Sequence, residues 1–296
     1  MDTKNTFTGT GVAIITPFKP DFSIDYIALE RQIEYLIDNK IDYIVLLGTT
    51  GESVTLSEYE KAELIKFVIQ KVDQRVPIVL GIGGNNTQSV IDKIRKTDFE
   101  HISAILSVAP YYNKPTQEGL YQHFKAIATA SPVPVILYNV PGRTGSNIKA
   151  ETTVRLANDF KNIIAVKEAS GDMSQAMYIV KNKPSDFHVI SGEDALTLPL
   201  ISIGFSGVIS VVANAFPAEF SQMVRLALNH DICEAQKIHY KLLEFIDTLF
   251  VEGNPAGVKE ALSIMGITSN YLRLPLVPVG TSTHEKLKKL IGEIKS

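Results

Sequence analysis

The sequence predicts an α/β fold: an eight-stranded parallel (β/α)8 TIM barrel with a small helical appendix at its C-terminal end. Short apolar, β-branched runs recur eight times, and amphipathic charged segments lie between most of them. Continuous apolar runs indicate strands covered on both faces, as in a parallel sheet. Strand–helix units spaced by roughly 20–35 residues fit a barrel of about 200–250 residues. A doubly wound sheet is the alternative, but the glycine-rich run at 81–85 lacks the spacing of a dinucleotide fingerprint.

The predicted strands are short, and nearly all end in Gly, Pro, Thr, Ser or Asn, which are typical of turns. In chain order they are Val12–Thr16, Tyr43–Leu47, Ile78–Gly81, Ile102–Val108, Val133–Tyr138, Ile163–Lys167, Phe187–Ser191 and Gly207–Val212.

The segments between the strands have the period of a helix. Within Ile24–Asp38, apolar residues recur at i, i+4, i+7 and i+8, on one helix face. Ser57–Gln70 opens on a capping-box pattern, with Ser57 followed by Glu60. The other helices predicted between strands are Gln88–Lys96, Glu118–Ala130, Thr152–Asn158, Ser174–Val180 and Leu196–Gly204.

Only helices are predicted after the eighth strand. They are Ala218–Asn229, Ile232–Phe250, Ala256–Met265 and Glu285–Ile294. We therefore expect a catalytic barrel over residues 1–230 and a helical domain over residues 231–296.

The composition is that of a soluble globular protein and excludes several functions. Net charge is −3 over 296 residues without a long basic block, so binding to nucleic acid or to a membrane surface has no electrostatic support. Cys233 is the only cysteine and the six histidines are scattered, so neither a disulfide framework nor a metal site is expected. The N-terminal residues lack the apolar core of a signal peptide, and no apolar run is long enough for a membrane span. A cytoplasmic protein is expected.

Lys167 is the most unusual residue of the predicted strands, because it interrupts the apolar run Ile163–Val166. Burying an unpaired ammonium costs several kcal/mol, so burial favours a neutral, nucleophilic amine suited to Schiff-base chemistry with a carbonyl substrate. Alternatively, the side chain packs its stem and extends its head into water. Strand alternation gives Lys167 the same side as Ile163 and Ala165, and small Ala165 would leave space for it inside the barrel.

The ends of other strands carry further candidates, and barrel active sites lie at these ends. Gly48–Ser53 holds two threonines between glycines, which suits carboxylate binding but also an ordinary turn. Tyr138 can extend its hydroxyl into the barrel mouth or pack in the core. Arg143 can hold a carboxylate or be solvated. Gly192 and the Gly207–Ser210 run allow close approach of a small ligand, and Glu193 and Asp194 can equally be acids that start a helix.

Five motifs in order and spacing give the chain a family resemblance over essentially its whole length. They are Gly48–Ser53, Tyr111–Pro115, Tyr138–Gly145, Val166–Gly171 and Gly207–Ser210. With them the chain resembles the dihydrodipicolinate synthase family of pyruvate-dependent, Schiff-base-forming aldolases. The resemblance implies condensation of pyruvate with L-aspartate 4-semialdehyde, without a cofactor.

The resemblance also implies roles for individual residues. Lys167 would form the Schiff base, and Tyr138, Thr49 and Tyr112 would form a proton relay. Tyr112 would come from a second subunit, which implies a homo-oligomer, commonly a tetramer built as a dimer of dimers. The residues implied to bind substrate are Thr50 and Ile209 for pyruvate and Arg143 for the semialdehyde carboxylate; we add Gly192 from its position at a strand end.

Related activities stay open at this point. N-acetylneuraminate lyases and 2-keto-3-deoxy-sugar aldolases share the fold, the lysine and the tyrosine, although Pro141–Gly145 is similar to the synthase pattern. A catalytically silent, ligand-sensing barrel is a remote alternative, and it predicts damage to the lysine, tyrosine and threonine set that is not seen.

The resemblance extends only in part to the site where lysine inhibits some members of the family. Residues of that site match Ser53, Leu56, Asn85 and Tyr111. Histidines and a glutamate common in the family are replaced by Glu58, Lys61 and Ser89. Without that acid the lysine ammonium loses a natural partner, which Glu58 could replace. We therefore expect weak sensitivity to L-lysine.

Overall fold

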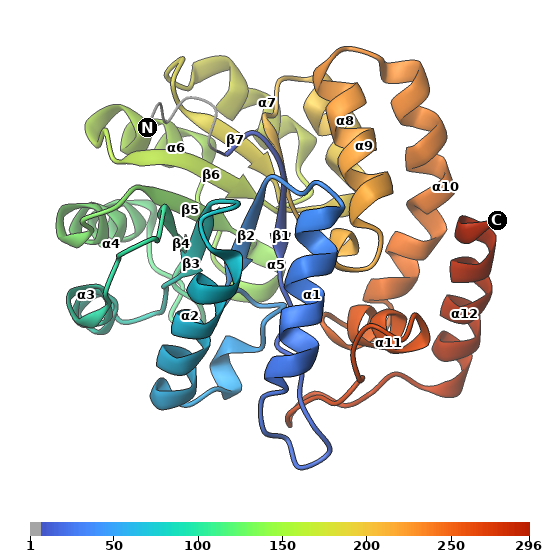
Figure 1. Ribbon diagram of the computed structural model, residues 1–296. Helices are drawn as coiled ribbons and strands as arrows, with labels where there is room; N and C mark the ends of the chain where they lie inside the picture. The colour runs from blue at the N-terminus through green and yellow to red at the C-terminus, as the bar shows by residue number, and fades with distance from the viewer. Residues whose placement is uncertain (1–6) are drawn as a thin grey trace.

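Eight parallel strands close into a barrel in chain order, which confirms the predicted fold (Figure 1). The structure is a computed structural model, and it describes residues 7–296. The strands are β1 (Gly9–Ala13), β2 (Tyr43–Leu46), β3 (Ile78–Gly81), β4 (Ala104–Val108), β5 (Val135–Asn139), β6 (Ile163–Glu168), β7 (His188–Ser191) and β8 (Gly207–Ser210).

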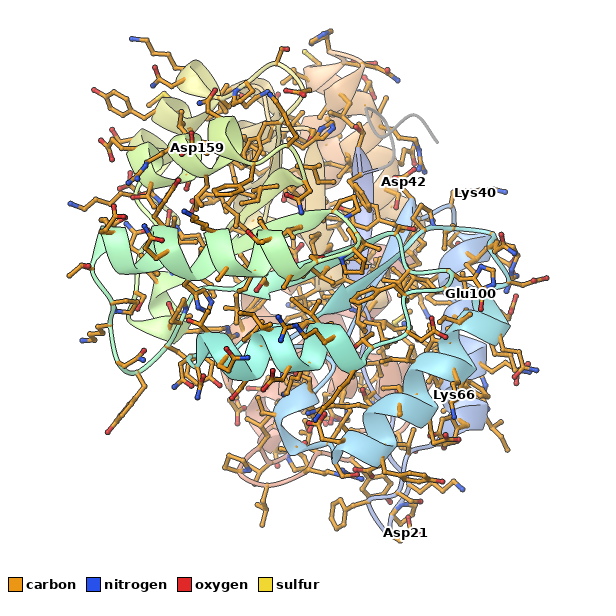
Figure 2. The ribbon with its side chains drawn as sticks, turned by 90° about the vertical axis from the view of Figure 1, so that its left-hand side faces the viewer. Asp21, Lys40, Asp42, Lys66, Glu100 and Asp159 are labelled. Carbon is orange, nitrogen blue, oxygen red and sulfur yellow. The ribbon has the colours of Figure 1, made fainter. Side chains whose placement is uncertain are left out.

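Helices surround the strands and cover their outer face (Figure 1). They are α1 (Tyr26–Asp38), α2 (Glu58–Val72), α3 (Thr87–Lys96), α4 (Gln117–Ala130), α5 (Pro141–Thr144), α6 (Ala150–Asp159), α7 (Met173–Asn182), α8 (Thr197–Ser202) and α9 (Pro217–Leu228). The capping box at the start of α2 is present as predicted: Ser57 Oγ accepts from the Glu60 N–H at 3.2 Å, and the Glu60 carboxylate accepts from the Ser57 N–H at 2.8 Å. Charged side chains such as Lys66 and Glu100 extend outward from this layer (Figure 2).

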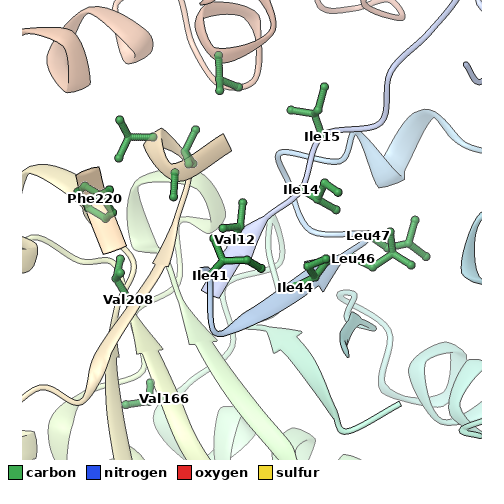
Figure 3. Close-up of a cluster of buried hydrophobic side chains, with 14 of the residues drawn as sticks. Val12, Ile14, Ile15, Ile41, Ile44, Leu46, Leu47, Val166, Val208 and Phe220 are labelled. Carbon is green, nitrogen blue, oxygen red and sulfur yellow. The ribbon is translucent and has the colours of Figure 1, made fainter. Parts of the chain in front are cut away.

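Alternate side chains of each strand belong to two separate hydrophobic cores. One core lies inside the barrel and includes Val45, Val79 and Ile190. The other lies between strands and helices; Val208 lies near Phe220 of α9, and Ile44 belongs to the same cluster (Figure 3). Because both faces of each strand are buried, the strands are continuous apolar runs in the sequence.

The predicted alternation along β6 is wrong at its first residue. Ile163 belongs to the outer core, whereas Ala165 belongs to the inner one. The reason is a register shift between β5 and β6: Val135 pairs with Ile163, and the next residue, Ile136, pairs with Ala165. The extra residue, Ile164, packs against the inner core and restores the alternation that points Lys167 inward.

Most strands also begin or end one to three residues away from the predicted boundary, and β1 and β8 show why. β1 begins at Gly9, before the predicted Val12, because backbone pairing with β8 includes two glycines and a threonine that give little propensity signal. β8 ends at Ser210 rather than Val212. Beyond it, the carboxylate of Asp194 accepts from the N–H groups of Val211 and Val212, both at 2.9 Å, and so replaces strand pairing.

The C-terminal segment forms three further helices on one side of the barrel, α10 (Ile232–Phe250), α11 (Ala256–Ile264) and α12 (Thr281–Lys295) (Figure 1). They share the outer core, since Phe245 of α10 packs edge-on against Phe216 with ring centroids 5.0 Å apart. Among residues 7–296, no helix has the length and apolarity needed to cross a membrane.

Candidate active site

A cavity opens at the carboxyl ends of the strands and collects most of the predicted site residues. It is lined by Ala13, Val45, Gly48, Thr49, Thr50, Leu106, Tyr138, Val140, Arg143, Lys167, Ala169, Gly192, Glu193, Val211, Phe250 and Asn254. The walls therefore come from every strand except β3, or from the loops after these strands, and from the C-terminal helical segment.

Lys167 and Tyr138 face each other in this cavity. They are register partners on β6 and β5, and the Lys167 Nζ lies 4.6 Å from the centroid of the Tyr138 ring. Lys167 is only 5% exposed, so the interpretation that its head extends into bulk water is wrong. Within the described residues its Nζ has no hydrogen-bond or ion-pair partner, which leaves the amine available for a ligand.

Gly192 makes room for the lysine. A Cβ built on Gly192 would lie 2.9 Å from Lys167 Cε and 2.6 Å from Ala169 Cβ, both too close for ordinary contact. The Gly192 N–H donates to the Glu168 carbonyl at 2.8 Å and fixes this approach. A side chain here would displace the lysine stem, so the position requires glycine.

The turn after β2 brings two threonines to the cavity wall. The Gly51 N–H donates to the Gly48 carbonyl at 3.2 Å, and the Thr16 hydroxyl donates to the Gly51 carbonyl at 2.7 Å. Thr49 is exposed at the mouth, whereas Thr50 is buried and its Oγ1 accepts from Asn254 Nδ2 at 3.0 Å. The alternative of a turn without a site is not supported, because both threonines line the cavity.

Two carboxyl groups, those of Glu193 and Asp194, interact electrostatically with Lys167. Burial raises the pKa of Glu193, partly opposed by Lys167 and Arg143, and burial also raises the pKa of Asp194. Glu193 lines the cavity, whereas Asp194 binds the backbone after β8, so neither serves only to start a helix. Negative charge near the lysine favours cationic intermediates on its nitrogen.

A hydrogen bond between Asn139 and Glu168 joins β5 and β6, the strands that carry Tyr138 and Lys167. Asn139 Nδ2 donates to Glu168 Oε2 at 3.0 Å, and these residues directly follow Tyr138 and Lys167. The Ser170 N–H and Gln175 Nε2 also donate to the Glu168 carboxylate, at 2.8 and 3.1 Å. Burial raises the pKa of Glu168, and the neutral donors oppose that shift. The network fixes the register that brings lysine and tyrosine together.

The remaining predicted residues lie at different distances from the cavity. Arg143, on α5, is exposed but contributes to the cavity wall at its mouth. Ile209 is buried in the inner core and is not among the residues that line the cavity; Val211 is. Tyr112 is 89% exposed and lies outside the cavity of its own chain.

The residues predicted for lysine binding do not line the cavity. Asn85 Nδ2 donates to the Tyr111 carbonyl at 3.2 Å, so these two are neighbours. Leu56 is buried beside the half-buried Ser53. Glu58 is exposed and already paired with Lys61 at 2.8 Å and with Lys93 at 3.7 Å.

The sequence prediction missed Phe250 and Asn254. Both lie in the segment expected to be an appendix, yet both line the cavity. The Asn254-Pro255 pair after α10 was a local signal of a shaped turn, but only the tertiary packing shows that it meets Thr50, 204 residues away.

Among residues 7–296, no group of three or more His, Cys, Asp or Glu side chains is arranged to hold a metal ion. The fold and the cavity define a TIM-barrel protein with a lysine-centred site at the carboxyl ends of its strands. A model of the dihydrodipicolinate synthetase family matches residues 6–294, and the chain belongs to this family.

Individual relatives agree over nearly the whole chain. The 4-hydroxy-tetrahydrodipicolinate synthase of Parabacteroides distasonis is 56% identical over 286 residues, 97% of this chain and 96% of the relative. The dihydrodipicolinate synthase structure from Thermotoga maritima has a TM-score of 0.96 and 40% identity, covering 98% of this chain and 99% of that one. A chloride-inhibited dihydrodipicolinate synthase from Acinetobacter baumannii, complexed with pyruvate, has a TM-score of 0.95 and 40% identity, with coverage of 98% and 99%.

Proposed function

We propose that this protein is a lyase of lysine and diaminopimelate biosynthesis that condenses pyruvate with L-aspartate 4-semialdehyde to give 4-hydroxy-tetrahydrodipicolinate. The observation that carries the proposal is the buried, unpaired Lys167 amine facing Tyr138. The 4-hydroxy-tetrahydrodipicolinate synthase of Parabacteroides distasonis has 56% sequence identity to this chain. A similar structure, the synthase from Acinetobacter baumannii, is a complex with pyruvate.

The reaction follows from an amine in this position. The Lys167 nitrogen attacks C2 of pyruvate, and the carbonyl oxygen leaves as water to give an iminium ion. That ion makes the pyruvate methyl acidic, because its nitrogen accepts the electrons of the broken C–H bond. The resulting enamine attacks the aldehyde carbon, and the amine of the second substrate then replaces Lys167 and closes the ring.

The surrounding residues divide the other tasks. Tyr138 moves protons at the lysine nitrogen and at the new alcohol, in a relay with Thr49 and with Tyr112 of a second subunit. Thr50 and the backbone at Gly192 and Ile209 hold pyruvate. Arg143, at the mouth, receives the carboxylate of the semialdehyde as a bidentate partner.

The protein acts in this proposal as a homo-oligomer, a tetramer built as a dimer of dimers. Support comes from Tyr112, which is 89% exposed in one chain and does not line the Lys167 cavity there. Sedimentation at assay concentrations should give a species larger than a monomer. A fully active monomer would remove Tyr112 from the relay. The proposed compartment is the cytoplasm.

A comparison of substrates tests the proposed function. Product formed from pyruvate and L-aspartate 4-semialdehyde should be reduced by a coupled dihydrodipicolinate reductase, with loss of NADPH absorbance. N-acetylneuraminate and 2-keto-3-deoxy-sugar acids should give no pyruvate. Pyruvate release from either sugar acid, without turnover of the semialdehyde, would reassign the protein to a sister aldolase.

A further inference from the structure

A buried ion pair connects the Gly48–Glu52 turn to the C-terminal helices. Lys259 of α11 donates to Glu52 Oε1, and both side chains are completely buried. The second carboxylate oxygen accepts from the Arg273 N–H at 3.1 Å, and Lys259 also donates to the Tyr271 carbonyl at 2.9 Å. The carboxylate of Glu52 is thus held entirely by a segment more than 200 residues away.

The turn needs such support because its backbone is strained. Leu47 and Glu52, the residues on either side of Gly48–Gly51, have φ angles of 58° and 50°. Non-glycine residues rarely occupy this left-handed region, and they persist there only where the surroundings hold them. Between these two residues lie Thr49 and Thr50, which line the cavity.

A second contact from the same segment reaches Thr50 itself. Asn254 Nδ2 donates to Thr50 Oγ1 at 3.0 Å, so the threonine hydroxyl keeps its own hydrogen for another acceptor. Asn254 is 8% exposed and lines the cavity, and its Oδ1 has no hydrogen-bond partner among the described residues. The acceptor that Thr50 can serve is therefore a ligand in the cavity.

We propose that the segment from Asn254 to Arg273 positions the carboxylate-binding turn of the active site. Lys259 is a positioning residue that acts through Glu52 on the backbone of the turn. Asn254 sets the Thr50 hydroxyl as a donor toward the substrate carboxylate. The inference rests on the proposed pyruvate chemistry and extends it to residues outside the barrel.

The role of the ion pair can be separated from a purely structural one. Lys259→Met alone leaves the buried Glu52 carboxylate unpaired and can prevent folding. The test therefore uses the double variant Lys259→Met/Glu52→Gln, in which both buried charges are removed. In the folded double variant we expect the pyruvate concentration for half-saturation to rise about tenfold, with a smaller loss of kcat, because the turn holds the carboxylate before and during the reaction.

The ion pair between Glu260 of α11 and His284 of α12 provides a matched control. Glu260, next to Lys259, accepts from His284 Nδ1 at 2.6 Å, away from the cavity. His284→Gln removes this ion pair of the C-terminal helices and should lower thermal stability while leaving pyruvate saturation unchanged. An equal rise in both variants would mean that general loosening of the C-terminal helices, not positioning, is responsible.

Asn254→Asp gives an independent test that keeps the volume of the side chain. The aspartate would accept from the Thr50 hydroxyl and bring a negative charge beside the substrate, so pyruvate should bind more weakly than in Asn254→Ala. A merely structural role predicts the opposite order. Pyruvate binding by Asn254→Asp at the wild-type level would overturn the proposed orientation of Thr50.

Pyruvate saturation of every variant is read from the pyruvate dependence of borohydride trapping on Lys167, which requires no second substrate. If the wild-type protein is not trapped at any pyruvate concentration, the proposed function fails. If it is trapped and the double variant Lys259→Met/Glu52→Gln has the same half-saturating concentration, the positioning inference alone fails.

Discussion

Lys167 and Tyr138 show how a single pair of residues determines the chemistry available to the cavity. The amine is buried without a fixed partner, and the nearest aromatic ring is that of a tyrosine whose hydroxyl is also without a partner among the described residues. An amine that can act as a nucleophile and a hydroxyl that can carry protons therefore lie on adjacent strand ends. This arrangement is the minimum required for imine formation without a second nucleophile.

Removing the Tyr138 hydroxyl should slow chemistry more than binding. In Tyr138→Phe we expect turnover to fall by about 10²-fold, the lower range for a general acid–base group, while half-saturation by pyruvate changes little. Steady-state kinetics and pyruvate-dependent trapping separate the two effects. Tyr35→Phe, which loses a hydrogen bond to the Ala215 carbonyl, is the control. Unchanged turnover in Tyr138→Phe would remove Tyr138 from the mechanism.

Candidate site residues at strand ends were predictable, because the neighbouring sequence is enough to assign them to the end of a strand. Lys167 interrupts an apolar run, Tyr138 ends a predicted strand, and Thr50 lies in the turn that follows another. Asn254 and Lys259 were not predictable, because their partners Thr50 and Glu52 are more than 200 residues away. Nothing in a local pattern shows which distant side chain fills a buried hydrogen bond.

At the scale of elements, strand boundaries depend on pairing as much as on composition. The extra residue in β6 changes which side chains face inward, and β1 begins in glycines that lack strand propensity. Period and composition set the order of strands and helices, whereas backbone partners set the register. The eight strands were therefore predictable and the bulge was not.

The C-terminal segment also connects to α2, through Arg273 and Glu60. Arg273 donates to Glu60 Oε2 at 3.0 Å and to the Thr55 carbonyl at 2.8 Å. Hydrogen bonding from Arg273 lowers the pKa of Glu60 to about 2. A carboxyl whose pKa is lower in the folded than in the unfolded protein stabilises the fold at pH values above its ordinary pKa. This contribution is lost as the pH falls toward about 2.

Glu60→Gln should therefore destabilise the protein in a pH-dependent way. Because the pair is partly exposed, we expect a loss of about 1–2 kcal/mol at pH 7, decreasing as pH falls from about 4.3 toward 2. Urea unfolding at several pH values measures this difference. Glu63→Gln, which breaks an exposed pair with Lys66, should change stability less. A difference that is constant with pH would argue against the ionic contribution.

At the scale of the whole molecule, the barrel and the C-terminal helices contribute to the same cavity. Phe250 and Asn254 line the cavity, and α10 shares the outer core with the barrel helices. A separate domain over residues 231–296 stays a prediction. Its helices were predictable from period, but their contribution to the site depended on how they pack.

Regulation by L-lysine is also a property of the assembled protein. Glu58, which could replace the missing acid, is already paired with Lys61 and Lys93. An incoming ammonium would have to displace these cations, so we expect weak inhibition. Titration of the coupled assay with L-lysine measures it, and half-inhibition well below about 1 mM would contradict this expectation.

The most direct test of the central claim is borohydride reduction in the presence of pyruvate, followed by peptide mass mapping. We predict a single reduced pyruvate adduct on Lys167 in the wild-type protein and none in Lys167→Ala. The other lysines provide an internal control, because they are modified only if trapping is nonspecific. An adduct on a different lysine, or no adduct at saturating pyruvate, would contradict the Schiff-base mechanism.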